Sequence, residues 1–129
     1  GDGARPSELR QWPIQLHLVS PDAPYYQDAD LLLCADCVPF AIGGFHRQHL
    51  RGRALAIACP KLDSDQQVYL DKLVAMIDRA PIRSLTVMVM QVPCCGGLRR
   101  LAELALQRAS RQVPLREVVV GLRGEILSG

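Results

Sequence analysis

The sequence has few aromatic residues, little excess charge and no long apolar run, and each shortage excludes a class of protein. Aromatic side chains make up 5% of the 129 residues, too few for the stacking platforms that bind single-stranded nucleic acid. The formal net charge of +2 is too small to indicate a nucleic-acid or anionic-membrane surface. No apolar run approaches the roughly 20 residues of a membrane-spanning helix. We therefore expect no nucleic-acid partner and no membrane span.

The first residues also lack the features of a secretory signal. Residues 1–6 are small and polar, with neither a basic nor an apolar region. We interpret residues 1–8 as a linker or an artificial remnant, and residues 9–129 as a single domain. With 49% apolar residues, a chain of this length can bury a substantial core. These features predict a cytoplasmic protein.

Apolar stretches of strand length alternate with segments of helical character. The expected strands are residues 14–19, 30–35, 54–58, 85–92 and 117–122. Their near-continuous apolarity is typical of strands that are covered on both faces. The alternation predicts an α/β fold of three layers: a doubly wound, mostly parallel sheet of about five strands with helices on both faces. Arg123 and Gly124 predict a tight turn in a C-terminal hairpin.

Start and stop signals locate three helices. A proline in the first turn favours a helix over residues 39–50. Ser64 and Gln67 have the spacing of a capping box, which predicts a helix that ends before Pro81. A third helix is expected to begin at residues 96–97.

The cysteines are placed in a way that indicates a shared site. Their number, five, is odd and does not suggest a disulfide scaffold. Four of them follow expected strands, and the carboxyl ends of parallel strands meet at one edge of a sheet. These four are Cys37, Cys59, Cys94 and Cys95. Cys34, inside an apolar run, is instead expected to be a core residue.

Four converging thiolates match the ligand count of a [4Fe–4S] cluster or of a structural zinc ion. Cys37 and the pair Cys94–Cys95 each precede an expected helix, whose unpaired N–H groups would stabilise thiolates. Three interpretations stay open: an iron–sulfur cluster, a zinc–thiolate module, or a metal-free thiol/disulfide enzyme. In the last, Cys94 or Cys95 would act as the nucleophile and its neighbour would resolve the disulfide.

Other polar residues are weaker candidates. His17, His46 and His49 could ligate a metal or move protons, although a histidine without such a role is the commoner case. Asp36 could orient a ligand and Lys61 could balance thiolate charge, but both are more often solvated loop residues. The sequence contains no Walker loop and no Gly-x-Gly-x-x-Gly fingerprint.

Several strings of residues follow one another in a familiar order. They are LRQWPIQL at residues 9–16, ADCVPF at 35–40, FHR at 45–47, CPKLD at 59–63 and VPCCGGL at 92–98. Together, over about residues 9–127, they resemble the C-terminal domain of a poorly characterised family of bacterial and archaeal 4Fe–4S ferredoxin-like proteins. In the usual member a ferredoxin segment precedes this domain, and the present sequence does not contain it.

The resemblance implies an iron–sulfur cluster and a redox role, and it carries Cys37, Cys59, Cys94 and Cys95 over as motif positions. We therefore expect a redox module with one [4Fe–4S] cluster that acts in electron transfer or redox sensing. The implied partner is a redox protein or a ferredoxin domain, and a homodimer is a further arrangement to consider. The resemblance names no reaction, so enzymatic activity is left open.

Overall fold

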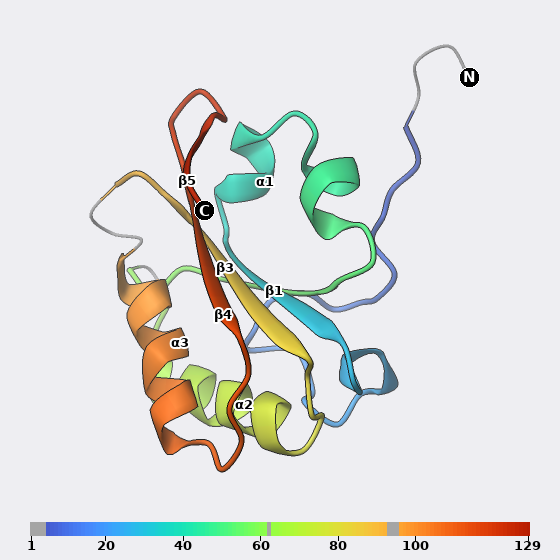
Figure 1. Ribbon diagram of the computed structural model, residues 1–129, viewed down its shortest axis with the longest axis vertical. Coiled ribbons are helices and arrows are strands. Elements are labelled where there is room, and N and C mark those ends of the chain that lie inside the picture. Colours follow the sequence, from blue (N-terminus) through green and yellow to red (C-terminus); the bar gives the residue numbers. More distant parts are fainter. Residues whose placement is uncertain (1–4, 62, 93–95) are drawn as a thin grey trace.

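The computed structural model describes residues 5–61, 63–92 and 96–129, and these build a five-stranded sheet (Figure 1). The strands are β1 (Asp30–Ala35), β2 (Ala54–Ala58), β3 (Ser84–Met90), β4 (Leu115–Val120) and β5 (Ile126–Ser128). Their spatial order is β2-β1-β3-β4-β5. The first four are parallel and β5 is antiparallel to β4. The predicted mostly parallel sheet with a C-terminal hairpin is confirmed.

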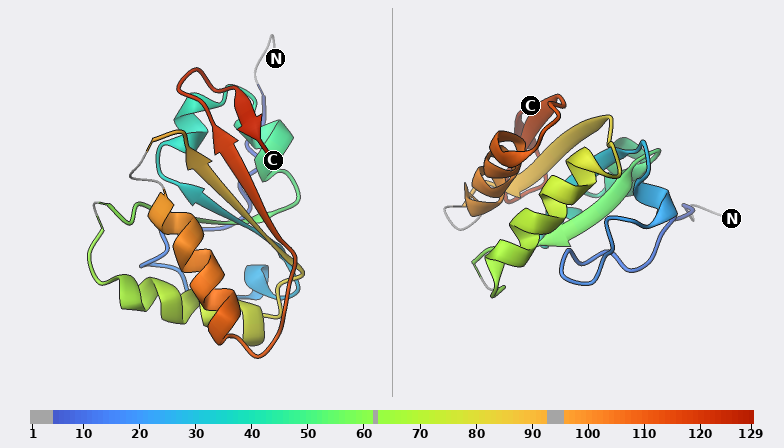
Figure 2. Two further views of the ribbon diagram at one scale, coloured as in Figure 1. Left: turned by 60° about the vertical axis from the view of Figure 1, so that its left-hand side comes forward. Right: turned by 90° about the horizontal axis from the view of Figure 1, so that it is seen from below.

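Helical segments cover both faces of this sheet. They are the 3-10 turn η1 (Pro24–Tyr26), α1 (Val38–Ala41), the π-helical turn η2 (His46–Leu50), α2 (Gln66–Asp78) and α3 (Gly96–Arg108). The connection from β1 to β2 runs in one direction along the sheet, and the next two connections run in the other. Right-handed crossovers therefore place α1 and η2 on one face and α2 and α3 on the opposite face (Figure 2). This is the predicted doubly wound fold.

The core lies along β1 and β3, the central strands. Five of the six residues of β1 and six of the seven of β3 are buried. Because helices lie on both faces, side chains that point either way are removed from water, which explains why these strands do not alternate in polarity. Cys34, in β1, is fully buried within this core, as its apolar neighbours predicted.

The strand predicted at residues 14–19 does not form. Only Gln15 makes a bridge, a parallel one with Ile57 of β2. The chain then turns, and the N–H of Val19 donates to the Gln15 carbonyl at 3.1 Å. The turn buries Leu16 and Val19, which are 0% and 2% exposed. The apolar residues of this stretch thus pack a turn against the sheet, and β5 takes the fifth place in the sheet.

Gln11 completes the outer edge of β2 with its side chain. Its Nε2 donates to the Leu55 carbonyl at 2.9 Å, and its Oε1 accepts the Leu55 N–H at 2.8 Å. The hydroxyl of Tyr26 donates to the same carbonyl at 2.9 Å. One side-chain amide therefore makes the two hydrogen bonds that the backbone of a neighbouring strand would make.

The helix predicted at residues 39–50 is divided in two. α1 ends at Ala41, and η2 begins at His46. Residues 43–44, both glycine, lie between them. Glycine has a low helix propensity and leaves the backbone free to change direction, so one long helix is replaced by two short turns.

The predicted capping box before α2 is also absent. The N-cap is Asp65, one residue after Ser64, with φ 60° and without a side-chain cap hydrogen bond. Gln67 donates its side-chain amide to Asp71 at 2.9 Å rather than reaching back to the N-cap. α2 itself occupies the predicted region and ends at Asp78, ahead of Pro81.

The C-terminal hairpin turns where the sequence predicted. Gly124 has φ +86°, and the N–H of Gly121 donates to the Glu125 carbonyl at 2.8 Å. An added Cβ at Gly124 would clash with the Ala41 carbonyl oxygen. Glycine is thus needed here both for the left-handed backbone and for the close approach of the turn to α1.

The described part of the expected linker is anchored at Glu8. Its carboxylate forms an ion pair with Arg51 at 3.0 Å, and its N–H donates to His46 Nδ1 at 3.0 Å. Glu8 is 8% exposed. The N-terminal segment therefore packs against the rest of the domain from Glu8 or earlier.

Within the described residues, no helix has the length and apolarity needed to cross a bilayer.

Candidate functional site

The ends of β1 and β2 bring two of the predicted thiols to one edge of the sheet. The N–H of Asp36 donates to the Ala58 carbonyl at 3.3 Å, so the chain that leaves β1 stays beside the end of β2. Cys37 and Cys59 are the next residues on these two segments, and they therefore emerge at the same edge. Cys37 is exposed and Cys59 is half-buried.

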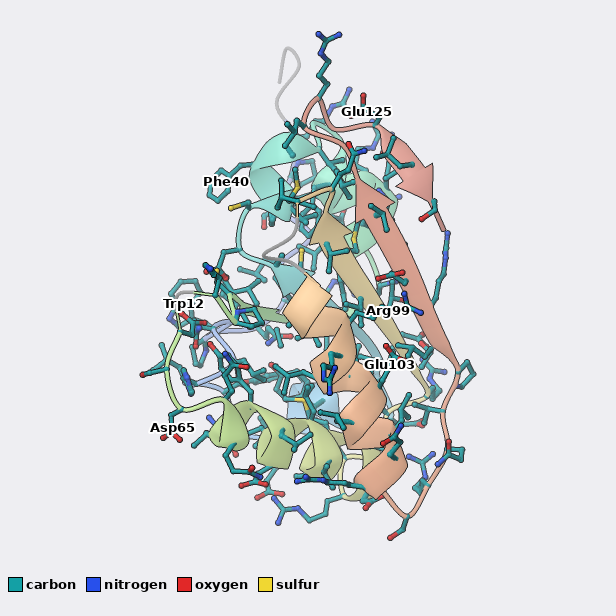
Figure 3. All side chains as sticks on the ribbon, turned by 90° about the vertical axis from the view of Figure 1, so that its left-hand side faces the viewer. Trp12, Phe40, Asp65, Arg99, Glu103 and Glu125 are labelled. Carbon is teal, nitrogen blue, oxygen red and sulfur yellow. The ribbon has the colours of Figure 1, made fainter. Side chains whose placement is uncertain are left out.

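Cys37 occupies the N-cap position of α1 without capping it. Its side chain makes no cap hydrogen bond, so the thiol is available for other chemistry. Pro39 stands within the first turn of this short helix. Phe40 follows, is 92% exposed, and projects outward from the domain (Figure 3). The surroundings of Cys37 are thus open to solvent and to other molecules.

Cys59 lies in a turn that Asp63 closes from both sides. The N–H of Asp63 donates to the Cys59 carbonyl at 2.8 Å. In return, Asp63 Oδ2 accepts the Cys59 N–H at 2.9 Å. A short polar side chain that accepts a nearby backbone N–H is a local means of fixing a turn. This pair of hydrogen bonds sets the position of the Cys59 backbone.

Asp63 is in turn held by side chains from two other segments. Tyr69 of α2 donates its hydroxyl to Asp63 Oδ2, and Gln15 donates its amide to the same oxygen at 3.1 Å. Burial opposes ionisation, but the hydrogen bonds from Tyr69, Cys59 and Gln15 together with the charge of His17 hold the pKa of Asp63 below its usual range. Asp63 is therefore an ionised acceptor that organises the turn.

Asp36 contrasts with Asp63. Its Oδ1 is buried and has no hydrogen-bond partner among the described residues. Burial raises the pKa of the Asp36 carboxyl, and the charge of Asp63 raises it further. Buried polar atoms are nearly always hydrogen-bonded, so an orphaned oxygen beside Cys37 marks a place where a bound group or a proton would complete the structure.

The beginning of α3 lies against the Cys59 turn. An added Cβ at Gly97 would lie 3.2 Å from Pro60 Cβ. Pro60 follows Cys59 directly, and Gly97 comes two residues after Cys95. Segments that follow β2 and β3 are thus in contact at this edge, and each of them carries a predicted ligand in its sequence.

Cys94 and Cys95 themselves lie outside the described residues. Among the described residues, no three side chains of histidine, cysteine, aspartate or glutamate are grouped closely enough to hold a metal ion. Cys37 and Cys59 therefore have no third ligand in that part of the chain, and the four-thiol set stays a prediction. Soft thiolates at this edge suit iron–sulfur or zinc binding in their donor chemistry.

None of the other candidate residues is placed as a metal ligand among the described residues. The ring of His17 stacks on Tyr69 with centroids 4.0 Å apart, and His46 accepts the Glu8 N–H. Burial, followed by the charges of nearby arginines, lowers the pKa of His49. Lys61 is exposed.

Sequence reasoning missed Asp63, Gln15 and Tyr69 as residues that organise the site. An aspartate four residues after Cys59 is a recognisable signal, because short polar side chains accept backbone N–H groups near them in sequence. Gln15 had no comparable signal, because it reaches Asp63 only through the fold, from 48 residues away.

The strand order defines where a ligand crevice is expected. The chain leaves β1 toward β2 on one side, and it leaves β3 toward β4 on the other side. Adjacent strands whose connections diverge in this way form the switch point at which open α/β sheets bind ligands. Cys37 follows β1, and the connection after β3 contains Cys94 and Cys95 in its sequence. Cys37, Cys94 and Cys95 therefore belong to the segments that flank the switch point, whereas Cys59 follows β2, the outer neighbour of β1.

Comparisons with known proteins bear on the fold and the family. Over 119 residues the chain is 28% identical to an uncharacterized protein of Archaeoglobus fulgidus, in an alignment that spans 92% of this chain and 83% of that protein. No solved structure matches the chain significantly. None of these findings shows a 4Fe–4S ferredoxin-like family, so that resemblance stays a prediction. The model of the Rossmann-like domain family matches residues 23–129, and the chain therefore belongs to that family.

Proposed function

We propose that the thiols at the carboxyl edge of the sheet hold one iron–sulfur cluster of the [4Fe–4S] type. Its ligands would be Cys37, Cys59, Cys94 and Cys95. The observation that supports this most directly is the contact between Gly97 and Pro60. It joins the start of α3 to the Cys59 turn, and a shared centre needs these segments to be neighbours.

The start of α3 and the turn at Cys59 favour thiolate ligands at this edge of the sheet. α3 begins at Gly96, so the unpaired N–H groups and the positive end of this helix come directly after Cys94 and Cys95 in the chain. Asp63 holds the Cys59 backbone in place through its two hydrogen bonds. The protein thereby contributes a preset turn and a favourable local charge, and the cluster, when bound, supplies a one-electron couple.

The role that follows is electron transfer or redox sensing with a redox protein or a ferredoxin domain, or between two copies of this chain. Cys37 is exposed and Phe40 beside it is 92% exposed, so a centre at this edge would lie near the surface that a partner reaches. Reduced thiols of this kind fit a cytoplasmic location.

The test is anaerobic reconstitution with iron and sulfide, followed by iron, zinc and sulfide analysis and by electron paramagnetic resonance of the reduced protein. We expect about four iron and four sulfide ions per chain. Replacement of any one of the four proposed ligands by serine should lower both contents markedly, because a hydroxyl is a hard and poorly ionised ligand. Cys34→Ala is the matched control, because Cys34 lies inside the core.

Other results of this experiment would support one of the alternative functions or contradict the proposed ligands. Zinc in place of iron in the isolated protein would support the zinc–thiolate module. Absence of both metals, with a disulfide that forms and is reduced reversibly, would support a thiol/disulfide enzyme that uses Cys94 and Cys95. Retention of a full cluster in the Cys37→Ser or Cys59→Ser variant would contradict the proposed ligand set.

A further inference from the structure

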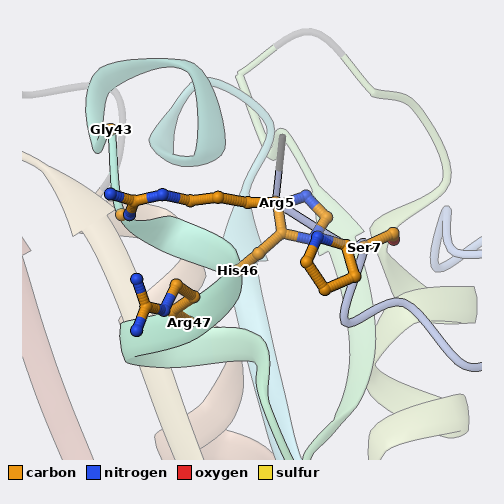
Figure 4. Close-up of a pocket in the computed structure, with 7 residues that line it drawn as sticks. Arg5, Ser7, Gly43, His46 and Arg47 are labelled. Atoms are coloured by element: carbon orange, nitrogen blue, oxygen red, sulfur yellow. The ribbon is translucent and has the colours of Figure 1, made fainter. Parts of the chain in front are cut away.

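The N-terminal segment and the region around η2 form two adjoining hollows that are lined by basic side chains (Figure 4). The first has a volume of about 220 Å³ and the second about 360 Å³. Both are lined by Arg5, Gly44 and Arg47; His46 contributes to the first, and Arg51 to the second. The guanidinium groups of Arg5 and Arg47 lie on the same side of the first hollow in Figure 4.

No described residue that lines the hollows compensates the charges of Arg5 and Arg47. None of the described residues that line them is acidic. The nearby carboxylate, Glu8, is buried and pairs with Arg51 at 3.0 Å. Arg5 and Arg47 form no ion pair within the described part of the chain. Two guanidinium groups from separate segments therefore converge with no acidic partner among the residues that the structure describes.

His46 lines the first hollow and carries a further ring nitrogen that can donate. The N–H of Glu8 donates to His46 Nδ1 at 3.0 Å. In the neutral imidazole the hydrogen must then reside on Nε2, because Nδ1 acts as the acceptor. A backbone contact outside the hollow thus fixes the tautomer of a residue that lines it.

We propose that these hollows bind the phosphate group of a small phosphorylated ligand. Guanidinium groups offer planar pairs of N–H donors that match phosphate oxygens, and such charge-assisted hydrogen bonds are strong. The oxygens of a tetrahedral phosphate can accept hydrogen bonds from several directions, as binding by Arg5, Arg47 and His46 would require. A carboxylate presents only two oxygens, which lie in one plane. The ligand is small, because the net charge of +2 does not support a polynucleotide track.

The experiment uses inorganic pyrophosphate as the probe, with isothermal titration calorimetry at an ionic strength of about 50 mM, where screening is moderate. Saturable binding to the wild-type chain is expected. Arg5→Gln and Arg47→Gln should each weaken it by about tenfold, the usual effect of removing one charge-assisted hydrogen-bonding group. Arg123→Gln removes an equal charge from the exposed β4–β5 turn and is the control.

The control should bind pyrophosphate within about twofold of the wild type, since distant exposed charges are screened. Equal weakening in all three variants would show a general charge effect and would overturn the proposal, as would the absence of saturable binding. Succinate that binds as tightly as pyrophosphate would overturn the phosphate assignment. Because these titrations are made on the metal-free chain, their result is independent of whether the thiols bind a cluster.

Discussion

Gly97 and Pro60 are in such close contact that an added Cβ on the glycine would lie 3.2 Å from Pro60 Cβ. Gly96, one residue earlier on α3, has no atom of the described residues within 4 Å of the same position. The two glycines are therefore a matched pair. Gly97 determines how closely α3 approaches the Cys59 turn, whereas Gly96 contacts none of the described residues at this position.

The first prediction compares alanine at these two sites. Gly96→Ala should change the free energy of unfolding by less than about 0.5 kcal/mol, because Gly96 is the first residue of α3 and helix propensity acts mainly in the helix interior. Gly97→Ala must push Pro60 away, so its stability should fall relative to Gly96→Ala, and its iron content after reconstitution should drop. Urea unfolding and iron analysis measure both effects. Identical behaviour of the two variants would mean that the contact does not matter to the site.

The second prediction concerns Asp63 and acid. Asp63→Asn keeps the shape but loses the charge that accepts the hydrogen bonds of Cys59 and Tyr69, and we expect a loss of about 1–2 kcal/mol at neutral pH. The pKa of Asp63 is held below its reference value of 3.8, so its stabilisation is present above that pH and is lost as the pH falls below it.

Urea midpoints of both proteins between pH 2.5 and pH 7 test this second prediction. The difference between them should be constant above about pH 5 and should shrink below about pH 4. Asp71→Asn, on the exposed side of α2, is the control and should change stability by less than about 0.5 kcal/mol. A difference for Asp63→Asn that persists to pH 2.5 would show that charge is not the cause.

The third prediction concerns Asp36, whose ionisation is expected to lower the stability of the protein, in contrast to that of Asp63. Burial, and then the charge of Asp63, raises the pKa of Asp36 above 3.8, so ionisation of Asp36 costs stability as the pH rises through this range. In the metal-free protein, Asp36→Asn should be more stable than the wild type at pH 7, and the two should converge as the pH falls toward 4. Urea midpoints between pH 4 and pH 8 measure this. A less stable variant at pH 7 would contradict the buried, unpaired state of this carboxyl.

The fourth prediction concerns the edge of β2. Gln11→Ala removes the partner of the Leu55 N–H and one of two donors to the Leu55 carbonyl, which keeps its hydrogen bond from the Tyr26 hydroxyl. We expect a loss of about 1–2 kcal/mol in the free energy of unfolding, because the N–H is left unsatisfied. Gln107→Ala, an exposed glutamine on α3, should be nearly neutral. Chemical denaturation gives both values, and equal values would show that water replaces the amide without cost.

The fifth prediction concerns Cys34. Its side chain is fully buried in β1, so Cys34→Ala should cost about 1–2 kcal/mol through lost packing. The iron content after reconstitution should not change. Loss of iron in this variant would place Cys34 among the ligands and would require a different ligand set.

Much of the fold was predictable because the strands of a doubly wound sheet are apolar on both faces. β1 and β2 have the predicted limits, and β3 and β4 differ by one or two residues at each end. The same criterion wrongly predicted a strand at residues 14–19, because the apolar side chains of a buried turn resemble those of a short strand in sequence. The hydrogen bonds from the Leu18 and Val19 N–H groups to the Gln15 carbonyl distinguish the turn from a strand.

The site was predictable only in its backbone placement. That Cys37 and Cys59 reach one edge follows from the parallel order of the strands. The support of the Cys59 turn by Tyr69 and Gln15 depends on side chains that come from separate segments. No spacing in the sequence encodes those contacts, because they exist only after α2 and the turn at Gln15 have packed.

The Gln11 amide and the Gln15 bridge have a further consequence for the behaviour of the molecule in concentrated solution. An edge strand with unpaired N–H and carbonyl groups is a template for another chain, and proteins protect such edges in order to avoid aggregation. Here a single side chain and one bridging residue occupy the outer side of β2. Removal of residues 5–16 would leave this edge open to intermolecular strand pairing. The N-terminal segment therefore covers the edge of the sheet in addition to packing against it.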